Sequence, residues 1–183
     1  VVSPDRSHKG ILLIDKDQVT VVPVDICFPV LHGKHGEDGT IQGLFQLAGI
    51  PFVGCNMISS ANCMDKEMTH TILEANGIKM AKWVIVNGEK MNDFENFAKD
   101  AEEKLGYPMF VKPANAGSSV GVGKAHNREE LKSACETALK EDYKAVVEEC
   151  IEMQEVETAV LGNGDPKAAG VVGELVPVVE FYT

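Results

Sequence analysis

The chain has 183 residues, of which 44% are hydrophobic and 25% charged, so its composition is that of a globular protein with one core or two small domains. The net charge of −11 disfavours nucleic acid and anionic membrane as main partners, because a phosphate surface attracts clustered cations. A nucleotide stays compatible with this charge, since it needs only a few local lysines. No apolar run has the length that spans a membrane.

The first part of the chain predicts an α/β unit. Two apolar runs at residues 11–14 and 19–24 flank a polar turn and predict a hairpin. Residues 26–31 are almost continuously apolar, which is typical of a strand covered on both faces. The next elements are a polar, glycine-rich loop at 32–39, a helix from about Thr40, and a short strand at 50–53. This part is therefore βαβ-like.

The second part mixes helices with antiparallel strands, which indicates an α+β arrangement. We predict helices over residues 59–76, 94–105 and 127–139, and strands at 83–86, 109–112, 120–122, 145–148, 155–161 and 170–179. We expect the boundary between the two parts near residues 56–65. The predicted division is 1–60 for the α/β remainder, 61–155 for a central domain and 156–183 for the start of a third.

The five cysteines form no C-x-x-C pair, and their odd number and wide spacing argue against a disulfide framework. Reduced thiols are typical of cytosolic proteins, so we expect a cytoplasmic location. Neither Cys63 nor Cys150 has an evident activating base, which disfavours a thiol nucleophile.

A strand that ends in Lys112 leads into a glycine- and serine-rich loop at residues 117–121. Glycines allow backbone N–H groups to turn toward an anion, and the hydroxyls add donors. The pattern therefore favours a polyphosphate site, with an ordinary surface turn as the alternative. It is not a P-loop, because Ser118 stands where the first glycine should be and Ala125 where Ser or Thr should be.

Other residues complete a nucleotide site in chain order. Lys66 and Lys112 can bind phosphates through charge-assisted hydrogen bonds. Glu148, near the end of a strand, can accept a hydrogen bond from an adenine amine, and Glu155 can bind ribose hydroxyls. The alternative is that the lysines are solvated and the glutamates form an exposed face.

The loop at residues 32–38 contains histidines and carboxylates, but their spacing is no zinc template. We expect His32 and Glu37 to bind the ammonium or carboxylate of a small zwitterion, aided by the N-terminus of the following helix. The remaining histidines are predicted to be solvent-exposed or structural: His8, His70 and His126.

These residues resemble a known family. His32–Gly43 matches the H-G-x-x-G-E-D-G-x-x-Q-G pattern of D-alanine–D-alanine ligases, which are members of the ATP-grasp superfamily. The family's further motifs follow in order: Pro51–Gly54, Met64–Lys66, Val111–Pro113 with Gly117–Gly121, and Ala159–Gly162. The resemblance extends over the chain from about Val24 onward.

The resemblance implies that ATP lies between two antiparallel sheets and that Mg²⁺ assists. It places Lys66 and Lys112 on the phosphates, and Glu148 on the adenine together with the backbone near Ile151. It places Glu155 on the ribose, and it closes the loop with Gly117 and Ser119 over the γ-phosphate. Ser118 is then a hydrogen-bonding catalytic residue, and His32 and Glu37 orient the first D-alanine. The implied reaction joins two D-alanines through an acyl phosphate for peptidoglycan precursor synthesis.

The family pattern also extends beyond Val1 and Thr183, where it has a glutamate-bearing turn and the magnesium ligands. We therefore expect an internal fragment with no metal ligands of its own and no turnover by residues 1–183 alone. A homodimer is expected only through the resemblance. Joining D-alanine to D-serine or D-lactate stays open, as do a non-catalytic nucleotide-binding module and another ATP-grasp ligase.

Overall fold

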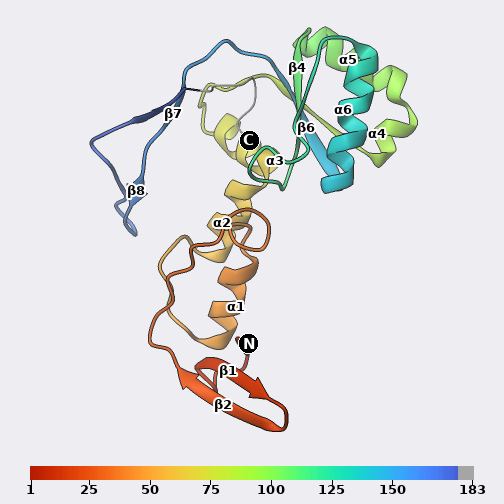
Figure 1. Cartoon of the computed structure of the whole chain (residues 1–183). Coiled ribbons are helices and arrows are strands. Elements are labelled where there is room, and N and C mark those ends of the chain that lie inside the picture. The colour runs from red at the N-terminus through yellow and green to blue at the C-terminus, as the bar shows by residue number, and fades with distance from the viewer. Residues whose placement is uncertain (177–183) are drawn as a thin grey trace.

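The computed structural model describes residues 1–176. Three helices, α1 (Thr40–Ala48), α2 (Met57–Met64) and α3 (Lys66–Ala75), follow one another in a column (Figure 1). A hairpin lies at one end of this column, and a four-stranded sheet with its own helices lies at the other (Figure 1). None of the helices in the described residues is both long and apolar enough to cross a membrane.

The predicted hairpin is confirmed. Strands β1 (Gly10–Asp15) and β2 (Gln18–Pro23) pair antiparallel, with Asp15 opposite Gln18. Lys16 in the turn has a φ of 51°, a left-handed conformation that a two-residue hairpin turn requires. Both strands are mostly exposed to solvent.

The prediction of a doubly covered strand at 26–31 is wrong. Pairing in this stretch is limited to one parallel bridge between Cys27 and Phe52, which the Cys27 N–H strengthens by donating to Pro51 O at 2.8 Å. Phe28 and Val30 are 74% and 70% exposed. An apolar run is buried only where other elements lie against it, and the described residues supply one bridge and no covering layer. The predicted strand at 50–53 is reduced to the same bridge, so the βαβ unit is minimal.

The predicted helix over 59–76 is two helices. Asp65 separates α2 from α3 with an extended backbone, at φ −78° and ψ 108°. Its carboxylate accepts hydrogen bonds from the backbone N–H groups of Glu67 and Met68, so it caps α3. A side chain that satisfies these N–H groups starts a new helix where the apolar periodicity alone predicts a continuous one.

The sheet has the order β3–β6–β4–β5, and every pair is antiparallel. Its strands are β3 (Trp83–Asn87), β4 (Met109–Pro113), β5 (Gly123–Ala125) and β6 (Lys144–Glu149). The predicted partner of β4 at 120–122 is wrong by three residues. Residues 118–121 form turns instead, since Ser118 and Ser119 have φ values of 51° and 58° that no strand accepts.

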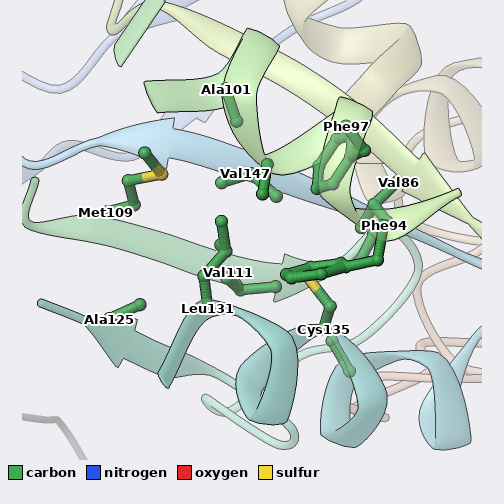
Figure 2. Close-up of a cluster of buried hydrophobic side chains, with 13 residues drawn as sticks. Val86, Phe94, Phe97, Ala101, Met109, Val111, Ala125, Leu131, Cys135 and Val147 are labelled. Atoms are coloured by element: carbon green, nitrogen blue, oxygen red, sulfur yellow. The ribbon is translucent and has the colours of Figure 1, made fainter. Parts of the chain in front are cut away.

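One face of this sheet is packed against helices α5 (Phe94–Leu105) and α6 (Arg128–Glu141), which a short helix α4 (Gly88–Asn92) precedes. Asn127 caps α6 by accepting from the Glu130 N–H. The core between the layers is fully apolar (Figure 2). Its members include Val86, Phe94, Phe97, Met109, Val111, Leu131, Cys135 and Val147.

Because strand residues alternate between faces, Val111 and Val147 enter the core while Lys112 and Glu148 emerge on the opposite face. That opposite face of the sheet is where the candidate site is built.

The last described segment consists of short strands. Strand β7 (Glu155–Glu157) pairs with β10 (Gly173–Leu175), and β8 (Val160–Leu161) pairs with β9 (Lys167–Ala168). The predicted single strand at 155–161 is therefore divided, because the Thr158 hydroxyl donates to Val171 O at 3.0 Å and the chain changes partner there. Of the predicted strand at 170–179, only 173–175 is observed, and its end lies outside the described residues.

Candidate functional site

Helix α3 and the sheet bring four side chains together. Lys66 and His70 are four residues apart on α3, so they share one face of the helix. That face meets the sheet face that bears Lys112 on β4 and Glu148 on β6, where the strand register sets Phe110 opposite Glu148. We call Lys66, His70, Lys112 and Glu148 the charged cluster.

Glu148 is the central member of the charged cluster. Its Oε2 accepts from Lys112 Nζ at 2.5 Å, and its Oε1 lies 2.9 Å from His70 Nε2. Glu148 is only 8% exposed. Burial raises the pKa of its carboxyl, but the charge of Lys112 and the hydrogen bonds from Lys112 and His70 outweigh burial and hold the pKa below its usual value. The carboxylate is therefore ionised and fixed by a donor on each oxygen.

The imidazole of His70 has three contacts. It stacks on the indole of Trp83 with ring centroids 5.3 Å apart and an interplanar angle of 22°. Its Nδ1 lies 3.1 Å from Met80 Sδ, while Nε2 faces Glu148. The ring is thus confined in plane and in rotation.

Lys66 connects α3 to the glycine–serine loop. Its Nζ donates to Ala116 O at 2.7 Å, and its backbone N–H donates to Ala114 O at 3.0 Å. Burial lowers the pKa of the Lys66 ammonium, and repulsion from Lys112 lowers it further. The Glu148 carboxylate offsets only part of this repulsion, because two cations face one anion. The net positive charge fits the triphosphate of ATP.

The glycine–serine loop lies against the loop of the His32–Gly43 motif. A Cβ added at Gly117 would be 3.3 Å from the Cα of Gly33, so the two backbones approach closely. Ser118 and Ser119 are exposed. Their left-handed φ values are energetically unfavourable for residues other than glycine. The loop closes its turns with N–H groups of Val120 and Val122, which donate to Gly117 O and Ser119 O at 3.2 Å each. The two loops that are predicted to bind ligands therefore lie next to each other.

A buried ionic network supports the start of this loop. Lys144, 7% exposed, pairs with Asp65 at 2.8 Å and with Glu67. Burial opposes the charge of Lys144, but the hydrogen bonds that its ammonium donates to the Asp65 and Glu67 carboxylates raise its pKa above the usual value. Asn115 donates to Asp142 Oδ2 through its backbone N–H at 2.8 Å and its Nδ2 at 2.9 Å. The network joins Asp65, which caps α3, to Asn115, the second residue after β4, and to Asp142 at the end of α6.

His32 and Glu37, the predicted substrate residues, are both exposed. Glu37 Oε2 accepts from the Gly33 N–H at 2.5 Å, which tightens the loop. Glu37 also lines a cavity of about 400 Å³ together with Gln42. Gln42 donates to Gly36 O at 2.9 Å, and its buried Oε1 has no hydrogen-bond partner among the described residues. The cavity therefore offers a carboxylate and an amide oxygen to a small polar ligand.

Two predicted residues lie apart from the charged cluster. Ile151 is 52% exposed, and Glu155 is exposed on β7, where it is opposite Leu175 of β10. Within residues 1–176 no hydrogen bond or ion pair joins either side chain to Lys112 or Glu148. Their roles at adenine and ribose stay predictions.

His70 is absent from the predicted site, although its prediction as a solvent-exposed or structural histidine agrees with a side chain that is 16% exposed and stacked on Trp83. The available signal was its i, i+4 spacing from Lys66 on a helix. The supporting residues Asp65, Asn115 and Lys144 were missed as well, since their partners are distant in sequence. No group of three or more histidines, cysteines or acidic residues in the described part of the chain could hold a metal ion.

Comparison with known proteins gives a consistent result. A family model described as D-ala D-ala ligase N-terminus matches residues 3–55, and one described as D-ala D-ala ligase C-terminus matches residues 72–183. The D-alanine–D-alanine ligase of Clostridium acetobutylicum is 53% identical over 160 residues, which are 87% of this chain and 46% of that protein.

Two solved structures are similar over most of the chain. The VanG D-Ala:D-Ser ligase of Enterococcus faecalis has a TM-score of 0.86 at 43% identity, covering 100% of this chain and 51% of that one. The D-alanine–D-alanine ligase of Coxiella burnetii has a TM-score of 0.76 at 33% identity, covering 90% and 50%. The chain thus spans about half the length of these relatives. The predicted fold class, an α/β part followed by an α+β ATP-grasp part, is confirmed.

Proposed function

The chain belongs to the D-alanine–D-alanine ligase family, and from this we propose that it forms the nucleotide-binding part of a ligase that joins two D-alanines while ATP is cleaved to ADP and phosphate. The product is a dipeptide for peptidoglycan precursor synthesis. The observation that supports this most directly is the charged cluster beneath a glycine–serine loop that lies against the His32–Gly43 motif.

In this proposal, Lys66 and Lys112 bind the phosphates of ATP. A phosphate between them reduces the part of their mutual repulsion that the Glu148 carboxylate does not already offset, and this favours binding. Gly117 and Ser119 close over the γ-phosphate, and the Ser118 hydroxyl donates to the reacting oxygens. Glu148 accepts from the adenine amine, with the backbone near Ile151 and the carboxylate of Glu155 completing the nucleoside contacts.

In this proposal the reaction has two steps. A carboxylate oxygen of the first D-alanine attacks the γ-phosphorus, the bond to ADP breaks, and an acyl phosphate forms. The amine of the second D-alanine then attacks the acyl carbon, loses a proton and expels inorganic phosphate. The lysines offset the charge that develops on the phosphoryl oxygens, while His32 and Glu37 orient the first D-alanine.

Magnesium would supply further charge neutralisation on the nucleotide when bound. The described residues contain no ligand set for it, so no step is assigned to magnesium through this chain. We also infer a cytoplasmic protein, because all five cysteines, which lie in the described part, are free thiols. A homodimer is inferred from the family resemblance, and sedimentation velocity tests it.

The proposal is tested with the complete gene product that contains this sequence. We expect phosphate release that requires both ATP and D-alanine. The Lys112→Met substitution should strongly lower the rate of this release. A matched control is Lys124→Met, since Lys124 lies on β5 of the same sheet, near the Phe110 ring. The proposal would be contradicted if the rate of phosphate release did not depend on D-alanine, or if Lys112→Met left this rate unchanged.

A second candidate is a D-alanine–D-serine ligase. It is favoured by the likeness to VanG, which is described as a D-Ala:D-Ser ligase and shares 43% identity with this chain. Offering D-serine or D-lactate beside D-alanine in the same assay, and identifying the dipeptide or depsipeptide by mass, decides between them. Nucleotide binding with no product from any of the three would indicate a non-catalytic module.

A further inference from the structure

We propose that His70 is a positioning residue that sets the base preference of the nucleotide site by holding the Glu148 carboxylate in place. This inference rests on the proposed function, in which Glu148 reads the base. His70 touches neither the phosphates nor the amino acids in that function. Its contacts are to Glu148, Trp83 and Met80.

The geometry around Glu148 leaves little freedom to the carboxylate. Lys112 donates to Oε2 at 2.5 Å, and His70 Nε2 is 2.9 Å from Oε1. Lys112 has a long, flexible side chain that is 30% exposed, whereas the His70 side chain is 16% exposed and stacked on Trp83. Of the two donors, His70 is therefore the rigid one and defines the plane of the carboxylate.

The sheet fixes the stacking partner. Trp83 on β3 is directly opposite Glu148 on β6, so the indole and the carboxylate emerge side by side on one face. His70 reaches both from α3. A ring that stacks on one residue and hydrogen-bonds its cross-strand neighbour locks the helix to the sheet at the position where the base would bind.

Position matters because bases differ at the atoms a carboxylate can reach. Adenine presents a 6-amino donor, while hypoxanthine presents a 6-oxo acceptor with an N1–H donor beside it. A fixed carboxylate accepts from the 6-amino group and repels the 6-oxo group. A carboxylate free to shift can instead accept from N1–H, so it would tolerate hypoxanthine. Losing the His70 contact should therefore relax the preference for ATP over inosine triphosphate.

The experiment measures kcat/KM for ATP and for inosine triphosphate in the complete gene product. We expect the unmodified protein to prefer ATP, and His70→Ala to reduce that preference about tenfold, the value of one charge-assisted hydrogen bond at a discriminating site. A gain of inosine triphosphate use relative to ATP is a readout that simple loss of stability would not produce.

Two amide variants serve as a matched pair. The amide nitrogen of glutamine is the same number of bonds from Cβ as Nε2 of histidine. His70→Gln should therefore keep the preference of the unmodified protein for ATP over inosine triphosphate. Asn carries its amide one bond closer, at the place of Nδ1 near Met80, so His70→Asn should behave like His70→Ala. Equal behaviour of the two amides would overturn the proposal.

A double-mutant cycle with Glu148→Gln tests whether His70 acts through Glu148. We expect His70→Ala to leave the nucleotide preference of the Glu148→Gln protein unchanged. An undiminished effect of His70 in that background, equal losses for both nucleotides in His70→Ala, or no preference in the unmodified protein would each overturn the inference.

If the proposed ligase function is wrong, no variant forms product with either nucleotide. The His70 inference is still tested in that case, because calorimetry measures the preference for binding ATP over inosine triphosphate. If His70→Ala fails to fold, His70→Gln against His70→Asn gives the same comparison with an amide that preserves most of the packing.

Discussion

Lys66 and Lys112 lie near enough to repel each other, yet they contribute differently to stability. Lys112 neutralises the nearly buried Glu148 carboxylate, whereas Lys66 donates to the backbone carbonyl of Ala116. Burial and repulsion lower the pKa of Lys66, so its charged form is disfavoured in the folded protein. Lys112 therefore stabilises the folded state, whereas the charge on Lys66 is disfavoured in it.

We predict that Lys66→Met keeps or raises the free energy of unfolding, because it removes a disfavoured charge. Lys112→Met should lower that free energy by about 1–3 kcal/mol, since it leaves Glu148 with His70 alone. Both should weaken ATP binding by about ten- to 150-fold. Urea unfolding and calorimetric titration measure the two quantities. Equal destabilisation by both substitutions would assign Lys66 a structural role instead.

The pH dependence of stability should report Glu148. Its pKa in the folded protein lies below the ordinary value of 4.5, so the unfolded chain binds this proton more readily. The stabilisation is fully present above pH 4.5 and is lost as the pH falls through the folded pKa. Glu148→Gln should therefore show a shallower loss of stability on acidification. Urea midpoints compared at pH 7, 5, 4 and 3 would refute this if the two curves ran parallel.

The conformation of the glycine–serine loop depends on a glycine that lies close to the end of β4. Gly121 has a φ of 71°, and a Cβ there would be 2.9 Å from Cγ of the Pro113 ring. A rigid ring at the end of β4 cannot move aside without disturbing the strand that bears Lys112. The shape of the loop and the position of the lysine are therefore coupled.

Gly121→Ala should lower the free energy of unfolding by about 1–2 kcal/mol, from the left-handed φ and the contact with Pro113. It should also weaken ATP binding, because the loop shifts relative to Lys112. Gly88→Ala is the matched control: no atom lies within 4 Å of the added Cβ, and alanine favours the helix that begins there. Thermal unfolding and calorimetry compare the two. If Gly88→Ala lowered the free energy of unfolding and ATP binding as much as Gly121→Ala, this prediction would be wrong.

Stability is unevenly distributed over the described chain. The apolar cluster that includes Val86, Leu131 and Val147 belongs to the sheet and the helices on its outer face (Figure 2). The hairpin at the other end exposes Leu13 and Ile14 at 55% and 61% (Figure 1). The described residues therefore place most of the buried apolar surface at the sheet end of the chain.

We predict that Leu131→Ala, at a fully buried position, lowers the free energy of unfolding by about 2–5 kcal/mol, whereas Leu13→Ala changes it by less than about 0.5 kcal/mol. Hydrogen exchange should accordingly be slowest in β4 and β6 and fast in the β1–β2 hairpin. Protection of the hairpin equal to that of the sheet would show that the core extends further than these contacts indicate.

Local patterns were sufficient for many elements. The hairpin, the helix from Thr40, helices α5 and α6 and the strand leading to Lys112 follow from alternation, helical spacing and caps, which act between residues close in the chain. The motifs around His32–Gly43 and Lys112 also placed the family correctly. The order of Lys66, Lys112 and Glu148 selected three members of the charged cluster, whose roles are still to be tested.

Other features depended on contacts that no local pattern contains. The break at Asp65 arises because its carboxylate caps α3 and pairs with Lys144 on β6. The exposure of residues 26–31 reflects which elements lie nearby, and apolar residues alone do not report that. His70 joins the site through a carboxylate 78 residues away. Propensity and periodicity act over a few residues, while burial, ion pairing and stacking are decided only when the folded chain brings distant residues together.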